Sequence, residues 1–350
     1  MEVAISLPGY TETLTDEMEK HDFLVHSFPL SEDQSIYSPF DYLYNKTLNE
    51  YQYKLVIDTN ILHFLLRSTQ GVNNVKTRAA VGLVAFCQLA EIDIDPALAV
   101  YELINHDEHR ADEAVEKMLI FDQINNADNQ QLVEFSLGHR DLFDLPTIPS
   151  RNKNELKSSL IKYRRLREWD SIYLIILAII DIDQSSTQSK DKLYRVIDWM
   201  YREFRLSAIA ISFCVVYFGK HPVKNMMKYK SSQSIEERLK CIENMTWDMY
   251  IMTRYLRTWI GNKTNDNFLY ASDDRAFRKT LRLCIDVQIT QGYTPYAPYL
   301  SSEVYKNITE LQNNGVPENE RIYQLDSDPE KYRINLINKF KEKLGLISIK

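Results

Sequence analysis

Residues 54–60 read Lys54-Leu55-Val56-Ile57-Asp58-Thr59-Asn60, a short apolar run that ends in a carboxylate and two small polar side chains. Such a run predicts a buried strand over residues 53–58. Open α/β sheets place their functional groups at the carboxyl ends of the strands, so we expect Asp58 at such an edge. A helix is expected to begin directly afterwards, at Ile61.

A second run of the same kind lies late in the chain. It reads Asn267-Phe268-Leu269-Tyr270-Ala271-Ser272-Asp273-Asp274 and predicts a strand over residues 267–272 that also ends in acids. Two strands that end in carboxylates suggest a shared metal site, because proteins hold Mg²⁺ through a few carboxylates plus water.

The composition is that of an ordinary globular protein. The chain has 350 residues and a formal net charge of −7, which argues against non-specific coating of nucleic acid but allows a local basic groove. Its four cysteines form no CxxC pair, so structural zinc and disulfides are not expected. No signal peptide is visible at the start, and the longest apolar runs, 172–180 and 206–218, are shorter than the roughly 20 residues of a membrane span. We therefore expect a cytoplasmic protein without a membrane partner.

The pattern along the chain predicts a core with additions. Residues 53–110 and 245–292 form the expected α/β core, 1–52 an irregular N-terminal arm, 111–244 a helical insertion and 293–350 a C-terminal extension. Helices are expected at 75–90, 97–109, 153–182, 191–218 (one or two), 247–260 with Thr246 as N-cap, 275–283 and near 329–344. Short extended segments are expected at 92–95 and 285–290.

This arrangement places four acids at the ends of elements. Asp58 closes the first strand, Glu102 lies in the helix after the second extended segment, Asp248 falls in the first turn of a helix, and Asp274, beside Asp273, closes the late strand. Four carboxylates that converge at one sheet edge would bind a divalent ion. Such an ion lowers the pKa of a bound water and neutralises a phosphodiester.

These residues resemble the PIN-domain family of metal-dependent nucleases. The resemblance rests on Val56-Ile57-Asp58-Thr59-Asn60-Ile61-Leu62, Val100-Tyr101-Glu102-Leu103, Trp247-Asp248 and Ser272-Asp273-Asp274-Arg275-Ala276-Phe277. It implies a three-layer α/β/α fold with a mainly parallel sheet, a Mg²⁺ or Mn²⁺ site, and cleavage of nucleic acid, RNA more often than DNA. The match makes Asp274, rather than Asp273, the corresponding acid, with Asp273 as a further candidate ligand. The long separation between Glu102 and Asp248 departs from the compact family pattern.

Asp170 is an alternative to Asp248 as the third acid, and the predicted acids can also be explained without a metal site. Asp170, in Glu168-Trp169-Asp170-Ser171, forms a second Trp-Asp pair on an expected helix. Asp58 could simply cap the following helix. Asp248 could be an acid that the helix dipole favours near an N-terminus. Glu102 taken alone would be one more solvated helical charge.

Other polar residues are candidates for supporting roles. Thr59 and Asn60 would hold the turn by local hydrogen bonds, with Asn60 also able to reach the metal, and Ser272 would orient an acid or a metal-bound water. Weak candidates for nucleic-acid contact are Arg275, Arg278, Lys279 and Arg282, together with Asn60 and Ser272. The basic stretch 162–167 and the pair His106 and His109 have plainer interpretations as solvated helix surface and a polar helix end.

The leading hypothesis is a metal-dependent endonuclease, most often acting on RNA, in which metal-activated water attacks the phosphodiester. The alternative is a catalytically silent PIN-like scaffold or regulatory protein that binds nucleic acid or protein. A phosphatase of the haloacid dehalogenase type ranks lower, because that chemistry needs an acid two residues after Asp58, where this chain has Asn60. A regulatory protein partner or a homo-oligomer is compatible with the large helical additions.

Overall fold

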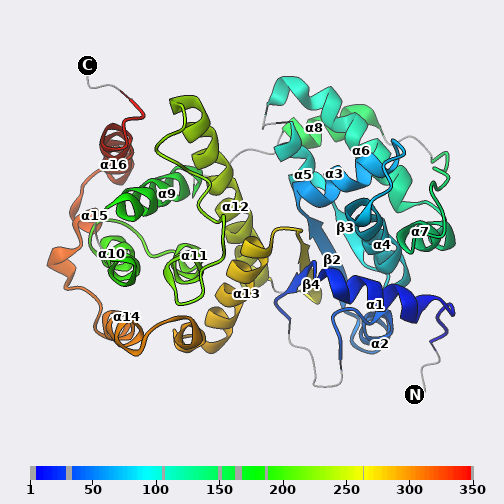
Figure 1. Cartoon of the computed structure of the whole chain (residues 1–350), viewed down its shortest axis with the longest axis horizontal. Helices are drawn as coiled ribbons and strands as arrows, with labels where there is room; N and C mark the ends of the chain where they lie inside the picture. The colour runs from blue at the N-terminus through cyan, green and yellow to red at the C-terminus, as the bar shows by residue number, and fades with distance from the viewer. Residues whose placement is uncertain are drawn as a thin grey trace. The chain divides into compact units, whose positions relative to one another are not determined.

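A computed structural model describes residues 5–28, 34–104, 107–148, 152–161, 168–185, 188–262 and 264–347. The chain divides into two compact units (Figure 1). Unit 1 comprises Met1–Arg164 and Thr258–Arg278, and unit 2 comprises Arg165–Arg257 and Lys279–Lys350. The predicted helical insertion is therefore divided, because its first part belongs to unit 1 and the rest joins the C-terminal extension in unit 2.

Unit 1 contains a four-stranded mixed sheet. Its strands are β1 (Leu24–His26), β2 (Gln52–Ile57), β3 (Asp93–Asp95) and β4 (Asp266–Ala271), in the order β1-β4-β2-β3. β2 pairs in parallel with both β3 and β4, and β1 pairs antiparallel with β4. The expected α/β class with a mostly parallel sheet is confirmed, and the three-layer PIN-like arrangement stays a prediction.

The register of the two central strands sets the edge at which the candidate acids lie. Alternate residues of β2, including Leu55 and Ile57, are fully or almost fully buried, as the apolar run predicts. Ile57 pairs with Ala271 at the carboxyl ends of β2 and β4. The next residues, Asp58 and Ser272, consequently leave the sheet side by side.

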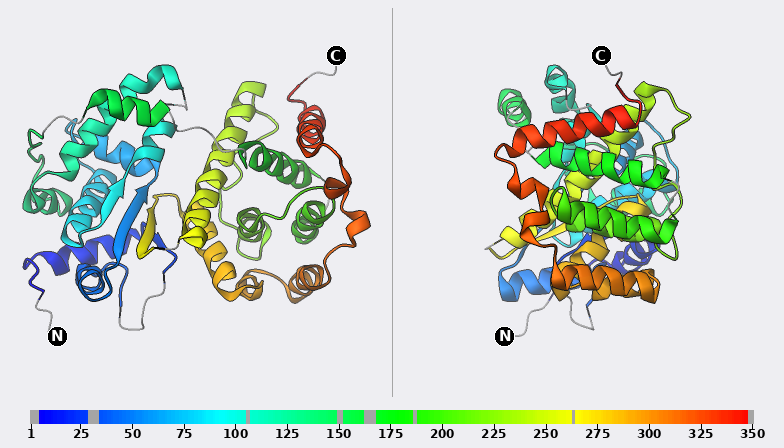
Figure 2. Two further views of the ribbon diagram at one scale, coloured as in Figure 1. Left: turned by 180° about the vertical axis from the view of Figure 1, so that it is seen from behind. Right: turned by 90° about the vertical axis from the view of Figure 1, so that its left-hand side faces the viewer.

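Helices enclose the core of unit 1. They are α1 (Thr11–His21), α2 (Pro39–Asn49), α3 (Thr59–Ser68), α4 (Val75–Leu89), α5 (Ala97–Leu103), α6 (Ala111–Asn125), α7 (Asn129–Ser136) and α8 (Lys153–Ile161), with a 3-10 turn at Glu108–Arg110. Figures 1 and 2 show α3, α4, α6 and α7 gathered to one side of the strands. α4 is the central helix, since it packs against α1, α3 and α7 and is buried over most of its length. A capping box between Asn74 and Thr77 fixes where it begins.

The described residues of unit 2 form helices joined by loops, and none of them belongs to a strand. Its helices are α9 (Glu168–Gln184), α10 (Ser189–Arg202), α11 (Ala208–Phe218), α12 (Ile235–Gly261), α13 (Arg275–Thr290), α14 (Ser302–Asn314), α15 (Ile322–Leu325) and α16 (Pro329–Lys343), with 3-10 turns at Thr294–Tyr299 and Glu318–Glu320. The division between the units falls within α12 and α13. The apolar runs of α9 and α11 are buried, as helices that are apolar all round must be.

The expected irregular N-terminal arm is wrong over most of its described length. Residues 5–28 and 34–52 contain α1, β1 and α2, and β1 completes one edge of the sheet. The buried side chains of Leu14, Met18 and Leu24 belong to the same core as β2 and α4. Burial of that apolar surface, and not local propensity, holds the segment in place.

Three further expectations about elements are corrected. Thr246 caps no helix: it lies inside the 27-residue α12, where its hydroxyl donates to the carbonyl of Ile242 at 2.7 Å. Residues 285–290 are the end of α13, not a strand. The helix expected at 97–109 ends at Leu103. Of the helix expected at 153–182, the described residues form α8 and α9, and 162–167 lie outside the described residues. The expected helices near 75–90 and 329–344 are confirmed by α4 and α16.

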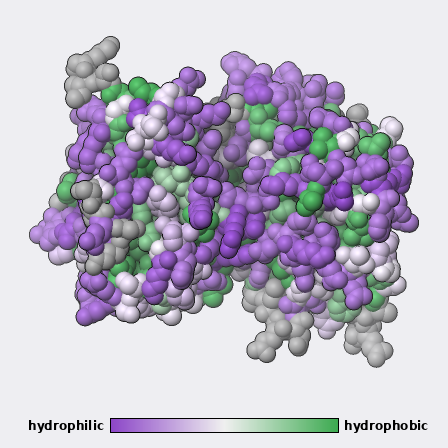
Figure 3. Space-filling model, viewed as in Figure 1, coloured by the Kyte–Doolittle hydropathy of each residue, from purple (hydrophilic) through white to green (hydrophobic). Residues whose placement is uncertain are grey.

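The surface carries mainly polar side chains in the view of Figure 3, with apolar ones scattered among them. Among the residues that the structure describes, no helix combines the length and the apolar character needed to span a bilayer.

Candidate metal-binding site at the sheet edge

Asp58 has two structural roles at the carboxyl end of β2. Its backbone N–H donates to the carbonyl of Ala271 at 2.9 Å, which extends the pairing of β2 with β4 by one residue. Its Oδ1 accepts from the N–H of Ile61 at 2.8 Å and so caps α3. Its Oδ2 accepts from the Ser272 hydroxyl at 2.5 Å. The carboxylate is thus a helix cap that also faces the end of the neighbouring strand.

Asp274 is joined to Asp58 through Ser272. The hydroxyl of Ser272, which is fully buried, accepts from the N–H of Asp274 at 3.0 Å while it donates to Asp58. Asp274 Oδ1 accepts from the N–H groups of Ala276 and Phe277 at 2.7 and 3.1 Å, and so it holds the first turn of α13. The Ser272 hydroxyl therefore joins the carboxylate of Asp58 to the backbone of Asp274.

Glu102 reaches the same edge from α5. Its Oε2 accepts a hydrogen bond from the hydroxyl of Thr59, the residue that follows Asp58. α5 packs against both α3 and β2, which fixes this approach. Sequence reasoning gave Thr59 only a local role in the turn, because the pattern of residues contains no signal for a contact across 43 positions.

The Ser272 hydroxyl thus connects the Asp58 carboxylate with the Asp274 backbone, and the Thr59 hydroxyl connects Glu102 with the residue that follows Asp58. These contacts do not form a closed ligand cage: within the described part of the chain, no three His, Cys, Asp or Glu side chains are grouped so as to hold one metal ion. Carboxylate oxygens are the donors that Mg²⁺ and Mn²⁺ prefer, so these acids have the right chemistry for such an ion but are not gathered around one point.

Asp248 and its rival Asp170 both belong to unit 2. Asp248 lies in the middle of α12, where its carboxylate accepts from Lys228 Nζ at 2.8 Å. Asp170 lies exposed in the first turn of α9, 3.9 Å from Arg333. The tryptophans that precede them, Trp247 and Trp169, pack together with ring centroids 6.1 Å apart. Both acids thus have a cation nearby, and the identity of the third acid stays a prediction.

Asp273 forms an ion pair at the surface. Its carboxylate lies 2.6 Å from Lys76 Nζ, and the lysine also lies over the ring of Phe64. An exposed pair of this kind is worth at most about 1 kcal/mol. Asn60 is exposed in the first turn of α3.

The basic residues that follow the late strand differ from one another. Arg278 is only 9% exposed and donates to the carbonyl of Ser272 at 2.6 Å, which favours a structural role over contact with a phosphate backbone. Arg275 is exposed, and Lys279 lies over the ring of Tyr299. Arg282 is half-buried. The basic stretch 162–167 and residue 106 lie outside the described residues, and the 3-10 turn at Glu108–Arg110 carries the exposed His109.

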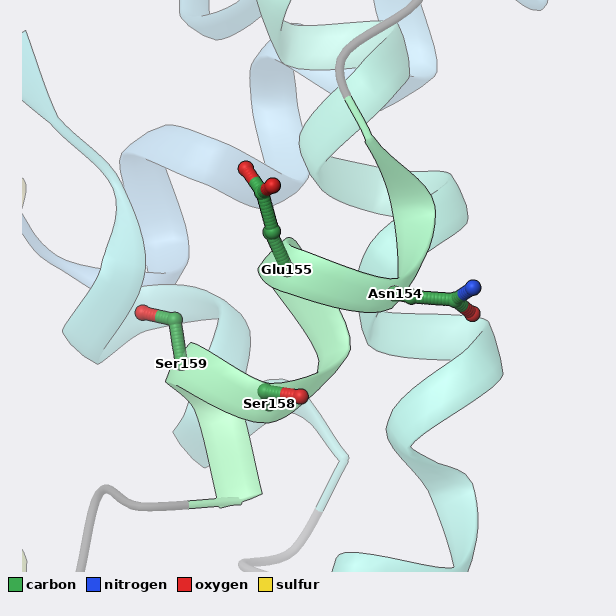
Figure 4. A pocket seen from close by; sticks show the side chains of 4 residues that line it. All are labelled: Asn154, Glu155, Ser158 and Ser159. Atoms are coloured by element: carbon green, nitrogen blue, oxygen red, sulfur yellow. The ribbon is translucent and has the colours of Figure 1, made fainter.

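Two hollows in unit 1 lie away from the linked acids. One, of about 460 Å³, is lined by the exposed residues Asn154, Glu155, Ser158 and Ser159 of α8 (Figure 4). The other, of about 290 Å³, lies beside β3 and includes Lys54, Asp93, Asp95 and the buried Asp122. Neither contains Asp58, Glu102 or Asp274.

Comparisons with protein-family models, with curated proteins and with solved structures found no match. The assignment of a chemical activity to the site therefore depends on the residues of the site alone.

Proposed function

We propose that the chain is a metal-dependent endonuclease that hydrolyses phosphodiester bonds, with RNA favoured over DNA. The observation that carries the proposal is the hydroxyl of Ser272, which donates to the Asp58 carboxylate and accepts from the backbone N–H of Asp274 at the ends of two adjacent parallel strands. A strand pair of this kind is where α/β sheets place their sites. The preference for RNA rests on the resemblance to PIN-domain nucleases.

Asp58, Glu102 and Asp274 supply the kind of oxygen donor that a hard divalent ion takes, although the described residues do not group three such side chains around one ion. Distant hydroxyls restrain the carboxylates of Asp58 and Glu102, and the N–H groups of Ala276 and Phe277 restrain that of Asp274. Asp248, the fourth acid that the sequence suggests, belongs to unit 2, and its part in the site stays a prediction. When bound, Mg²⁺ or Mn²⁺ would supply an activated water and neutralise charge on the phosphodiester.

The hydroxyls of Ser272 and Thr59 orient two of the acids. Ser272 fixes the direction of the Asp58 carboxylate, and Thr59 fixes that of Glu102. Hydrogen-bonded partners of this kind raise metal affinity because they prevent ligands from rotating away. Asp58 also keeps its cap on α3, so movement of the acid is coupled to the helix.

A cleavage assay on labelled single-stranded RNA, structured RNA and single-stranded DNA tests the proposal. It compares the wild type with Asp58→Asn and Asp274→Asn in Mg²⁺, in Mn²⁺ and in EDTA. Asp273→Asn is the matched control, since this neighbouring acid pairs with Lys76 at the surface. We expect metal-dependent cutting that the first two substitutions abolish and the control retains.

If the folded protein cleaves none of the substrates in Mg²⁺ or in Mn²⁺, the proposal is wrong. The alternative of a scaffold or regulatory protein would then remain. Asp248→Asn and Asp170→Asn, assayed in the same way, decide which acid completes the site. If only one of these two proteins fails to cleave, the acid that was substituted in it is the one that completes the site.

A further inference from the structure

An arginine side chain joins the carboxyl end of β4 to the first turn of α13. Arg278 Nη1 donates to the carbonyl of Ser272 at 2.6 Å, and the arginine is buried, with 9% of its surface exposed. Its Nε has no hydrogen-bond acceptor among the described residues and lies 3.9 Å from Asp22 Oδ2. A buried charge is costly unless it is hydrogen-bonded, so the bond to the Ser272 carbonyl is the contact that fixes where this guanidinium lies.

Ser272 is held at each of its polar groups. Its N–H donates to the carbonyl of Phe23 at 3.2 Å, just before β1 begins, and its carbonyl accepts from Arg278. Its hydroxyl donates to Asp58 and accepts from the N–H of Asp274. All of these residues belong to unit 1. The bond from Arg278 is the one that acts on the peptide unit by which the chain leaves β4.

The direction of that peptide unit decides whether the hydroxyl of Ser272 meets the N–H of Asp274. A peptide unit is planar and only the dihedral angles on either side of it are soft, so a carbonyl that is held in place fixes the path of the chain beyond it. The backbone N–H of Arg278 also donates to the carbonyl of Asp274, at 3.0 Å. The backbone and the side chain of Arg278 therefore close a ring of hydrogen bonds that contains both Ser272 and Asp274.

We propose that Arg278 is a positioning residue of the candidate site. Through the Ser272 carbonyl, it holds the Ser272 hydroxyl in the direction that serves both the Asp58 carboxylate and the Asp274 backbone. It acts through the serine and not on the substrate. The effect of Arg278 on cleavage rests on the proposed nuclease function, whereas its effect on the bond between Ser272 and Asp274 does not.

Amide hydrogen exchange at the N–H of Asp274, followed by NMR on the full chain, tests the positioning without substrate or metal. Arg278→Met keeps an apolar stem and removes the donor. Exchange of this N–H should become about tenfold faster, because hydrogen bonds to charged groups contribute at least that much. Arg278→Lys keeps a cation that can donate one bond, and one bond is what the Ser272 carbonyl accepts from Arg278, so most of the protection should return.

Arg238 provides the matched control. Its guanidinium also donates to backbone carbonyls, those of Leu344 and Gly345, at 2.9 and 3.3 Å, but it belongs to unit 2. Arg238→Met therefore loses contacts of the same kind far from Ser272 in the chain. It should leave the exchange at Asp274 at the wild-type rate.

The same three proteins, assayed for cleavage over a range of Mg²⁺ concentrations, test the effect on the acids. Arg278→Met should raise the Mg²⁺ concentration for half-maximal cleavage by about tenfold, because the partners that orient metal ligands affect metal affinity to this extent. Arg278→Lys should return this concentration close to that of the wild type. Arg238→Met should respond to Mg²⁺ as the wild type does.

Unchanged exchange at Asp274 in Arg278→Met would overturn the proposal, whatever the cleavage assay gives. Faster exchange together with a normal response to Mg²⁺ would also overturn it, because Arg278 would then support the turn without acting on the acids. If the wild type cleaves no substrate, the nuclease function is wrong. The exchange rates alone then decide whether Arg278 positions Ser272.

Discussion

The hydroxyl of Ser272 donates a 2.5 Å hydrogen bond to the carboxylate of Asp58, although 214 residues separate the two in the chain. The bond exists because Ile57 pairs with Ala271 in the parallel register of β2 and β4. The same hydroxyl accepts from the N–H of Asp274, so a single buried serine connects both strand ends. It is the structural centre of the candidate site.

Ser272→Ala should therefore destabilise the protein by about 1–2 kcal/mol, because it removes one hydrogen bond to a charged acceptor and leaves the partly buried N–H of Asp274 without its acceptor. Urea denaturation of the two proteins measures the difference. Ser158→Ala, an exposed serine of α8, is the control and should stay within about 0.5 kcal/mol of wild type. Equal effects of the two substitutions would mean that the serine bridge contributes nothing to stability.

The two roles of Asp58 can be separated by substitution. Asp58→Ala loses both the cap on α3 and the acceptor of the buried Ser272 hydroxyl and should cost about 2–3 kcal/mol, whereas Asp58→Asn keeps a cap and should cost less. Both should abolish metal-dependent cleavage if the acid binds the ion. Asp128→Ala removes the N-cap of α7 and should cost about 1 kcal/mol, the cost of a cap alone, while activity is kept. If Asp58→Asn still cleaves nucleic acid, the carboxylate of Asp58 has only a structural role.

Thr59 is a positioning residue for Glu102 in the proposed nuclease. Thr59→Val keeps the shape of the side chain and removes the hydroxyl, so the Mg²⁺ concentration for half-maximal cleavage should rise by about 10–100-fold. Thr59→Ser keeps the hydroxyl and should restore near-normal metal dependence. A normal response to Mg²⁺ in Thr59→Val would show that the contact with Glu102 does not act on the metal.

The sequence predicts the two central strands because each is a buried run that ends abruptly in polar residues. It does not predict β1, since a three-residue edge strand carries almost no periodic signal and forms through pairing with Leu269–Ala271. The prediction of a strand at 285–290 is wrong for a related reason. The apolar residues there are compatible with a strand or with a helix, and the burial of Leu281, Cys284 and Ile285 in the interior favours the helix.

The candidate site also contains features that the sequence predicts and features that it does not. Asp58 and Asp274 follow from strand ends, which are local features of the sequence. The bonds from Thr59 to Glu102 and from Ser272 to Asp58 depend on tertiary packing and have no local signature. Thr246 shows the opposite error, since a good capping residue lies inside a helix when the apolar pattern continues through it.

A close backbone approach in unit 2 gives a prediction about stability. A Cβ atom at Gly219 would lie 2.4 Å from the carbonyl oxygen of Val215 and 2.7 Å from that of Tyr299. Because backbone atoms cannot rotate away, Gly219→Ala should destabilise the protein by about 2–3 kcal/mol. Gly261→Ala is the control: a Cβ there meets nothing within 4 Å, and its stability should be unchanged or slightly higher. A Tm of Gly219→Ala equal to that of the control would contradict the close contact.

The cysteines give a test of the buried core that needs no substitution of the site. Burial raises the pKa of the Cys284 thiol to about 12 and raises the thiol pKa of Cys87 and Cys214 as well. The thiolate is the reactive form, so at pH 8 these three thiols should not react with a disulfide reagent while the protein is folded. Cys241, which is only partly buried, should react, giving one thiol per chain against four in denaturant. Cys241→Ser should abolish the reaction of the folded protein. Rapid reaction of more than one thiol in the wild type would mean that α4, α11 or α13 opens readily to solvent.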